Sequence, residues 1–263
     1  MGFDLHVHSI YSDGALTPGQ LVIEAIAQGL TGIALTDHDT VDGLPEAVAA
    51  GQQQNLPVIP GIELTTDFGK IEAHILGYNL NYREPTLVRK LEAILAARVG
   101  RVQEIVKRLN RRGIPLQWSE VQTLANSRFI GRTQVFTAME RRGLIDPLRR
   151  KQSFEYYLGS EGIAYVPHRE IETREAIELI NACGGVPVLA HPGRGGVDVV
   201  IRQLVDFGLK GLEVYYPTHT PEMVKKYLQF ATEFGLIITG GSDYHGRPGQ
   251  PLGEAQVYSL PFN

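Results

Sequence analysis

Near its N-terminus the chain reads Asp4-Leu5-His6-Val7-His8-Ser9, and Asp13 follows four residues later. Apolar and polar residues alternate in this stretch, which predicts a short strand with both histidines on the same side. Such a pair of imidazoles needs partners, and short motifs of similar composition recur along the chain. These motifs are Thr36-Asp37-His38-Asp39, Gly61-Ile62-Glu63, Glu72-Ala73-His74, Ala190-His191-Pro192 and Gly241-Ser242-Asp243-Tyr244-His245. Most of them end a short apolar run, so we expect one pocket that collects them around metal ions.

The composition is that of a soluble globular protein, with 263 residues of which 43% are hydrophobic and 21% are charged. This length allows one large domain or two ordinary ones. The net charge of −4 does not support stable binding of duplex nucleic acid, which usually needs a basic excess. The single Cys183 rules out an internal disulfide and fits a reducing compartment. We find neither a secretory segment nor an apolar run of about 20 residues, so we expect a cytoplasmic protein without a membrane span.

Strands and helices are expected to alternate over most of the chain. Apolar runs predict strands at 3–8, 32–36, 56–63, 70–78, 185–191, 211–216 and 236–243. Helical patterns occur at 17–29, 43–53, 173–183, 198–207 and from 220 onwards. The first of these helices has Thr17 as its N-cap, Pro18 at its first position and Gln20 three residues after the cap. This rhythm predicts parallel β/α units, in which functional residues gather at the C-terminal ends of the strands.

The pattern changes at about residue 80, where strands give way to helices in an arginine-rich block. Apolar residues recur at helical spacing from Leu87 to Leu109, and the break Gly113-Ile114-Pro115 follows them. The expected helices in this block are at 85–112, 118–125 and 131–143. We therefore expect an α/β barrel domain with a helical insert as a substrate cap, the barrel formed by 1–79 and 165–263 and the insert by 80–164.

Nine residues of the strand-end motifs and the loop near them are candidate metal ligands. They are His6, His8, Asp13, His38, Glu63, His74, His191, Asp243 and His245. A single histidine at a strand end is more often structural, but six of the eight histidines lie in such motifs beside carboxylates. Imidazole and carboxylate suit Zn²⁺, Mn²⁺ or Fe, and nine ligands fit three ions if one carboxylate, for which we choose Glu63, is shared. Clustered cations favour attack of a metal-activated hydroxide on phosphorus.

The nine positions resemble those of the PHP (polymerase and histidinol phosphatase) superfamily over both β/α portions of the chain. The resemblance implies a distorted (β/α)7 barrel with two to three divalent metal ions, Mn²⁺ being favoured and Zn²⁺ or Fe being compatible. It also implies how the ligands are shared. The first ion would take His6, His8, Glu63 and Asp243, the second Glu63, His74 and His191, and the third Asp13, His38 and His245.

The insert narrows the resemblance to the nucleoside 3′,5′-bisphosphate phosphatase group, which includes 5′-to-3′ exoribonucleases of the RNase AM type. Its motifs Ile130-Gly131-Arg132 and Ala164-Tyr165-Val166-Pro167 are similar to those of that group. The chain departs from the pattern in two places. Thr133-Gln134 stands where Pro-His is expected, and His168 stands where arginine is expected. Both positions are expected to face the substrate, so the departures concern substrate specificity.

Four arginines are candidate phosphate contacts. Arg132 and Arg194 match the group, and guanidinium donates paired hydrogen bonds to phosphate oxygens, although ordinary solvated arginines are the alternative. Arg98 and Arg101 lie three residues apart on the long expected helix and share one of its faces. That face either contacts phosphate or is simply exposed to solvent.

Two further residues are candidates for a catalytic role. His219 lies in a loop after an apolar strand and is a candidate general acid for the leaving oxygen or a substrate contact. The alternative for His219 is a structural role. Asp37 precedes His38 and is expected to orient that ligand, with a helix cap as the alternative.

These features favour a phosphoric monoester hydrolase that acts on a nucleotide, in particular a nucleoside 3′,5′-bisphosphate. A first alternative is 5′-to-3′ digestion of short 5′-phosphorylated RNA, because either substrate presents a phosphate to the same ions. A second is a non-catalytic metal-binding PHP module, which predicts missing ligands. An amidohydrolase barrel also begins with a His-x-His strand, but the nine-ligand set and the Asp243-x-His245 ending argue against it. The partner is thus a small nucleotide or a short oligonucleotide, and the sequence indicates no particular oligomeric state.

Overall fold

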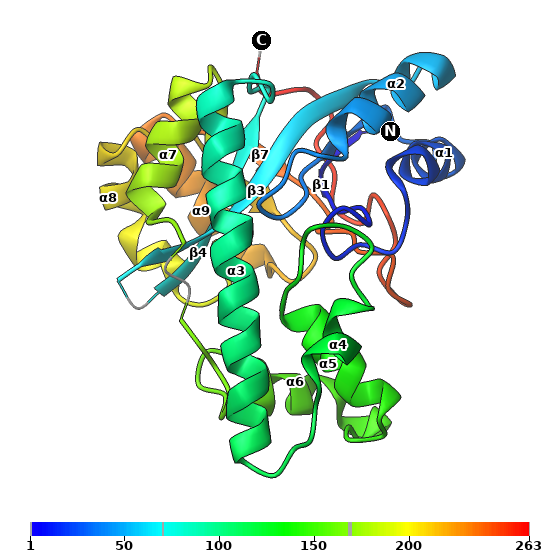
Figure 1. Ribbon diagram of the computed structural model, residues 1–263. Helices are drawn as coiled ribbons and strands as arrows, with labels where there is room; N and C mark the ends of the chain where they lie inside the picture. Colours follow the sequence, from blue (N-terminus) through cyan, green and yellow to red (C-terminus); the bar gives the residue numbers. More distant parts are fainter. Residues whose placement is uncertain (1, 70, 168–169, 263) are drawn as a thin grey trace.

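In the computed structural model, which describes residues 2–69, 71–167 and 170–262, seven strands form one sheet (Figure 1). The strands lie side by side in the order in which they occur in the sequence. Their bounds are β1 Phe3–Val7, β2 Gly32–Leu35, β3 Val58–Phe68, β4 Ile71–Tyr78, β5 Val186–Leu189, β6 Gly211–Tyr215 and β7 Ile237–Gly240. All seven fall where apolar runs predict strands, and β3 continues beyond its expected end at residue 63.

The direction of β4 departs from the expected fold. β1, β2 and β3 are parallel, as are β5, β6 and β7, but β4 is antiparallel to both β3 and β5. The prediction of parallel units is therefore wrong at this strand. β3 ends at Phe68 and β4 begins at Ile71. A connection this short can join only antiparallel strands, because parallel strands need a crossover of a dozen or more residues.

The inner face of the curved sheet carries an apolar cluster. Successive strands β1 to β5 each contribute a buried residue, namely Leu5, Ala34, Ile59, Leu76 and Val188. Val257 and Phe262 of the C-terminal segment join the cluster, and Phe262 stacks on Tyr78 of β4. The two edges of the sheet also approach each other, since Val7 forms an isolated parallel bridge with Tyr244, which follows β7. These contacts give the strands the arrangement of a distorted β/α barrel.

Helices that connect the strands cover the outer face of the sheet. They are α1 Pro18–Ala27, α2 Leu44–Gln54, α7 Thr173–Ala182, α8 Ile201–Asp206 and α9 Pro221–Phe234. α7 packs against β3, β4 and β5, and α9 packs against β6 and β7. The expected start of α1 is confirmed, because Thr17 and Gln20 form a capping box and Pro18 opens the helix. The helix expected at 198–207 begins instead as a 3-10 turn, Val197–Val200, which leads into α8.

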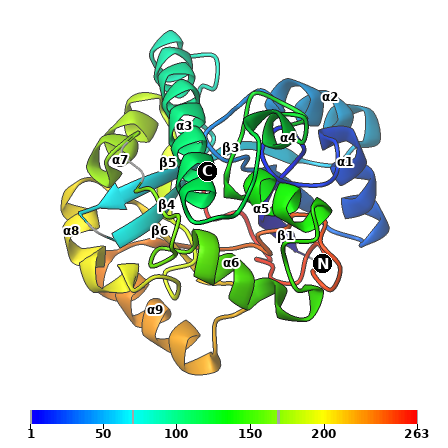
Figure 2. The same cartoon turned by 60° about the horizontal axis from the view of Figure 1, so that its bottom comes forward.

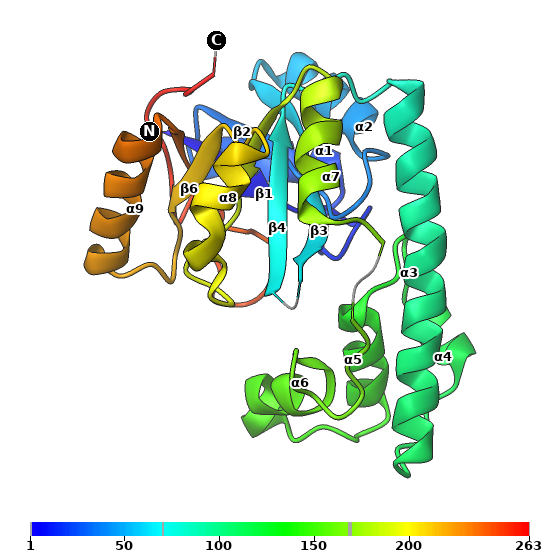
Figure 3. The same cartoon turned by 90° about the vertical axis from the view of Figure 1, so that its left-hand side faces the viewer.

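Between β4 and α7 the chain forms a helical insert. Its elements are α3 Pro85–Arg111, α4 Trp118–Gln122, α5 Arg132–Arg141, the 3-10 turn η1 Pro147–Arg149 and α6 Arg150–Leu158. The long helix α3 runs past the barrel and carries α4, α5 and α6 beyond one end of the sheet (Figures 1 and 3). In the view from that end, α5 and α6 lie in front of the strands (Figure 2). Among the helices of the described residues, none is both long and apolar enough to cross a membrane.

The insert has a hydrophobic core of its own. The first half of α3 packs into the barrel core through Leu87, Leu91 and Ile94. Its second half, from Val102 to Leu109, packs into a separate cluster with residues of α4, α5 and α6. A single continuous helix therefore belongs to both cores and fixes the insert relative to the barrel. α6 lies where the sequence predicts no helix, and of its residues only Leu158 is buried.

The separate core of the insert can be tested with two leucines. Leu109 is fully buried in the insert, whereas the side chain of Leu148 is 94% exposed. We expect Leu109→Ala to lower the free energy of unfolding by about 2–5 kcal/mol, because it leaves a cavity in a packed core. Leu148→Ala should change it by less than about 0.5 kcal/mol. Chemical denaturation followed by circular dichroism measures both, and equal effects would contradict a packed core.

Candidate metal centre

The candidate ligands lie in strands or in the turns that follow them. The positions are His6 in β1, His8 and Asp13 after it, His38 after β2, Glu63 in β3, His74 in β4, His191 after β5, and Asp243 and His245 after β7. Backbone strain marks three of the turns, since Asp39, His191 and Asp243 have φ angles of 52°, 27° and 52°. Such conformations cost about 1–3 kcal/mol each in residues other than glycine, and they are typical of functional sites.

Glu63 lies at the centre of the site, and its carboxylate is fully buried. Its two oxygens face different histidines. Oε2 is 3.2 Å from Nε2 of His6 and 3.2 Å from Nε2 of His8. Oε1 is 2.7 Å from Nδ1 of His74 and 3.2 Å from Nε2 of His191. This division between two sets of imidazoles is the geometry of a bridging carboxylate.

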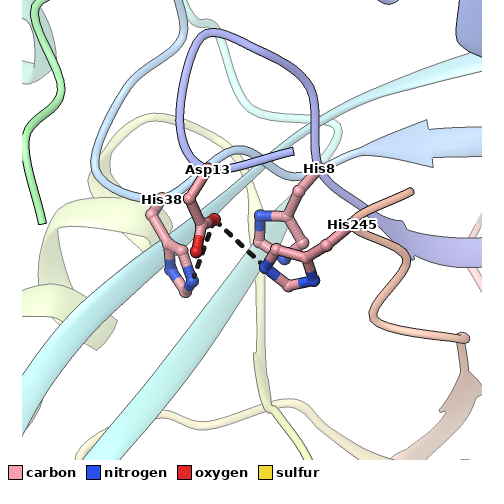
Figure 4. A group of neighbouring side chains, drawn as sticks. All are labelled: His8, Asp13, His38 and His245. Atoms are coloured by element: carbon pink, nitrogen blue, oxygen red, sulfur yellow. Dashed lines mark ion pairs between the residues drawn. The ribbon is translucent and has the colours of Figure 1, made fainter. Parts of the chain in front are cut away.

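Among the described residues, three groups of side chains present ligand atoms that lie within 4.8 Å of one another. They are His6, His8, Glu63 and Asp243; His8, Asp13, His38 and His245; and His38, Glu63 and His74. The first two groups contain the ligand sets expected for the first and third ions. The remaining group shares Glu63 and His74 with the set expected for the second ion, and His191 joins it through Glu63. Figure 4 shows His8 and Asp13 of the loop after β1 facing His38, which follows β2, and His245, which follows β7.

Five ligand atoms of these groups are buried without a hydrogen-bond partner among the described residues. They are Nε2 of His6, Nε2 of His8, Oδ1 of Asp13, Nδ1 of His38 and Oε2 of Glu63. A buried polar atom without a partner costs about 1–3 kcal/mol. Bound cations would satisfy all five, because the donor set consists of imidazole nitrogens and carboxylate oxygens. The residues present therefore fit the metal centre that the sequence implies.

The charges of the cluster also call for cations. Burial alone would lower the pKa of His8, but its interactions with Asp243 and Glu63 outweigh burial and raise that pKa to about 10. Burial likewise opposes a charge on His74, yet Glu63 and Glu72 raise its pKa to about 9. The buried carboxylates thus draw positive charge into the site, as protons on His8 and His74 when metal is absent. Metal ions compete with these protons for the same ligand atoms.

Two carboxylates outside the predicted ligand set, those of Glu213 and Asp4, support the ligands. Glu213 of β6 places Oε1 2.9 Å from Nδ1 of His6 and accepts the backbone N–H of His191 on Oε2, at 2.7 Å. This contact orients the His6 ring and leaves its Nε2 for a metal. The sequence feature that could have identified Glu213 is its position as a charged residue within the apolar run Gly211-Leu212-Glu213-Val214. Asp4, also buried in a strand, accepts the backbone N–H of Ser242 and so supports the turn that carries Asp243.

Asp37 supports a different ligand from the one expected. Its carboxylate accepts hydrogen bonds from the backbone N–H and the hydroxyl of Ser9 and from the hydroxyl of Ser12. Ser12 in turn lies 3.5 Å from Nδ1 of His8. The expectation that Asp37 orients His38 is therefore corrected, because its oxygens are taken by the loop that follows His8.

A cavity of ≈ 840 Å³ extends from the ligands to the insert, and Arg132 and Arg194 both line it. Arg132 opens α5 and pairs with Glu72, with 2.9 Å between Nη2 and Oε1. Arg194 lies 3.3 Å from the ligand Asp243, and more than half of its side chain is exposed. The structure therefore places both expected phosphate contacts in one cavity with the metal centre.

Arg98 and Arg101 are buried, so the alternative of solvent exposure is excluded for both. The guanidinium group of Arg98 donates hydrogen bonds to Asp39 and to the hydroxyl of Thr65, and it also lines the cavity. Arg101 lies outside the cavity lining and pairs with Glu170, with 3.1 Å between Nε and Oε1. The two arginines share a helix face, as expected, but that face is the junction between the insert and the barrel.

His219 lies outside the cavity lining. Its Nδ1 is 2.9 Å from the carbonyl oxygen of Val214, and its Nε2 accepts the backbone N–H of Gly193 at 3.2 Å. With both ring nitrogens engaged, the geometry favours the structural alternative over proton transfer. His219 thereby fixes the turn between His191 and Arg194. The position of His168, the other expected specificity residue, lies outside the described residues.

The fold and the site define a β/α barrel protein with buried clusters of histidine and carboxylate side chains that could hold metal ions. The model of the PHP domain matches residues 4–127. The chain is 32% identical over 266 residues to a 3′,5′-nucleoside bisphosphate phosphatase from Chromobacterium violaceum, covering 96% of this chain and 91% of that one. This protein belongs to the PHP family.

Two further comparisons agree with this assignment. A 5′-3′ exoribonuclease from Haemophilus influenzae is 34% identical over 248 residues, which cover 92% of this chain and 89% of the relative. A crystal structure from Bifidobacterium adolescentis, described as a candidate metal-dependent phosphoesterase, superposes with a TM-score of 0.89 at 31% identity. The superposition covers 98% of this chain and 93% of that one. The similarity therefore includes the helical insert as well as the barrel.

The support of His6 by Glu213 predicts a measurable effect on metal binding. Glu213→Gln preserves the shape of the side chain but removes its charge, so we expect affinity for Mn²⁺ to fall about 10–100-fold. Isothermal titration calorimetry of the metal-depleted protein measures this change. Glu233→Gln is the matched control, because Glu233 of α9 pairs with Arg202 of α8 and more than half of each side chain is exposed. Equal Mn²⁺ affinities of the two variants would show that Glu213 does not act on the site.

Proposed function

We propose that this protein is a metal-dependent phosphoesterase that removes a phosphate from a nucleotide, with a nucleoside 3′,5′-bisphosphate as the favoured substrate. The observation that carries the proposal is Glu63, whose two oxygens face separate sets of histidines beneath a cavity lined by arginines. Cations bridged by a carboxylate suit displacement at phosphorus, and arginines suit the recognition of its oxygens. The activities named for the relatives from Chromobacterium violaceum and Haemophilus influenzae support the same chemistry.

The residues have distinct roles in this proposal. The nine ligands would hold two to three divalent ions, and a set without cysteine supports Mn²⁺, with Zn²⁺ or Fe as compatible alternatives. When bound, such ions supply Lewis acidity that acidifies water and offsets the charge of a phosphate. Arg132 and Arg194 would bind phosphate oxygens with paired N–H donors. Glu72 and Asp243 hold these guanidinium groups at the cavity wall, ready for the phosphate.

A second proposal, exonuclease action on short 5′-phosphorylated RNA, is supported by the far end of the cavity. There α6 contributes Arg150, Lys151 and Phe154 to the lining. Arg150 is already paired with Glu140, whereas no ion pair of Lys151 occurs within the described part of the chain. A cation and an aromatic ring at a distance from the ligands suit a second phosphate and its base.

A non-catalytic metal-binding module is the weaker alternative. Such a module would tolerate the loss of ligands, whereas this chain retains all nine together with the carboxylates that orient them. A cytoplasmic location is also part of the proposal, supported by the single Cys183, which is buried in the barrel core.

The proposed reaction requires both the metal and its ligands. Metal-depleted protein should be inactive, and added Mn²⁺ should restore phosphate release from adenosine 3′,5′-bisphosphate or mononucleotide release from a 5′-phosphorylated oligoribonucleotide. Asp243→Ala and His8→Ala should each lower turnover by roughly 10³-fold or more, because the metal contributes several kcal/mol of charge stabilisation. Their circular dichroism spectra should match that of the unaltered protein. Full activity of the metal-depleted protein would refute the proposal.

Lys151 separates the two substrate classes. If the oligonucleotide extends along α6, Lys151→Ala should lower kcat/KM for a 5′-phosphorylated trinucleotide about 10–100-fold, the value of one charge-assisted hydrogen bond. The value for adenosine 3′,5′-bisphosphate should change less than about twofold. Lys107→Ala, an exposed lysine of the insert outside the cavity, is the control. An equal loss with both substrates would contradict a separate subsite on α6.

A further inference from the structure

Within the described part of the chain, one hydrogen bond joins the insert to a candidate metal ligand. Thr133, in the first turn of α5, donates its hydroxyl to Oδ2 of the candidate ligand Asp13, at 3.0 Å. Gln134 fixes the same turn, because its Oε1 accepts the backbone N–H of Gly131 at 2.8 Å. Thr133-Gln134 is the position at which this chain departs from the expected Pro-His. The two residues therefore have defined partners here, one in the helix start and one in the metal centre.

The two oxygens of Asp13 face in different directions. Oδ1 faces the ligand cluster, 3.1 Å from Nε2 of His245 and 3.9 Å from Nε2 of His38 (Figure 4). Among the described residues Oδ1 has no hydrogen-bond partner, as expected of an atom that awaits a cation. Oδ2 is held from outside the cluster by Thr133 and, at 3.6 Å, by Arg247. The carboxylate is thereby fixed with one oxygen presented to the site.

Asp13 differs in charge from the three histidines with which it forms a ligand group. Of the four side chains that form it, Asp13 is the one carboxylate, and the others are His8, His38 and His245. It therefore supplies the negative charge that compensates a divalent ion there. Outer partners that orient a ligating carboxylate typically contribute 10–100-fold to metal affinity. The other carboxylate ligands, Glu63 and Asp243, have their contacts within the barrel.

We propose that Thr133 is a positioning residue that sets the affinity of the Asp13 site and couples the occupancy of this site to the position of the insert. Removing its hydroxyl leaves Oδ2 with the longer contact to Arg247 at 3.6 Å, so the carboxylate can rotate away from the geometry that presents Oδ1. The cation bound by Asp13, His38 and His245 is then lost first, while the ions at Glu63 are retained. This inference rests on the metal-binding part of the proposed function and is independent of the substrate.

The experiment measures binding of Mn²⁺ alone to the full metal-depleted chain, by calorimetry and by the amount of metal retained after gel filtration. Thr133→Val removes the hydroxyl at nearly constant volume, and Thr133→Ser retains it. Asp13→Asn is the reference variant for loss of Mn²⁺ binding at this site. Thr123→Val is the control, because Thr123 lies in the same insert and, among the described residues, its hydroxyl bonds only the backbone carbonyl of Glu120.

We expect the unaltered protein and Thr123→Val to bind three ions. Thr133→Val should weaken the last ion about 10–100-fold and otherwise resemble Asp13→Asn, and Thr133→Ser should restore the affinity. Unchanged binding by Thr133→Val would overturn the inference, as would an equal loss at every site or a failure of serine to restore affinity. If Thr133→Val does not fold, binding by Thr133→Ser decides, since a serine variant without the last ion contradicts the role of the hydroxyl. An unaltered protein that binds no Mn²⁺ would instead refute the proposed function.

Discussion

A buried carboxylate surrounded by imidazoles is the constraint on which this structure depends. Glu63 has no exposed surface, and burying a charged carboxylate costs several kcal/mol unless opposite charge accompanies it. Burial would raise the pKa of Glu63, but positive charge on nearby histidines, among them His6 and His74, holds that pKa well below its usual range. Metal ions can supply the same positive charge without protonating the ligands. The barrel is thus built around a negative charge that divalent cations would neutralise.

The sheet topology follows from this requirement. Because β3 and β4 form an antiparallel hairpin, Glu63 and His74 extend toward each other from adjacent strands. An isolated parallel bridge between His38 and Glu63 brings the end of β2 to the same point. A uniformly parallel barrel would deliver ligands only at strand ends, whereas this hairpin adds a ligand from within a strand. The reversal of β4 is therefore part of how the centre is assembled.

Short sequence motifs predict those features of the site that depend on residues close together in the chain. His6 and His8 alternate along one predicted strand, and Asp243 and His245 follow another apolar run, so their ligand character is visible without the fold. Glu213 is different, because its value lies in a contact with His6 that is 207 residues away in the chain. The direction of β4 also depends on where β3 ends, and apolar composition does not mark that end. Sequence patterns thus identify the ligands, and the long-range contacts that orient them become visible only in the folded chain.

The contacts at the junction between the barrel and the insert are likewise visible only in the folded chain. The sequence makes Arg98 a candidate phosphate contact. In the structure its guanidinium group instead bonds Asp39, the neighbour of His38, and charge alone cannot reveal a buried partner 59 residues away in the chain. Arg101, one turn further along α3, pairs with Glu170. Buried ion pairs contribute little net stability, but breaking one is costly, so they favour a single register. Since α3 passes from one hydrophobic core to the other at this point, the pairs fix where the insert lies relative to the candidate ligands. The hydroxyl of Thr133 reaches Asp13 only in that register.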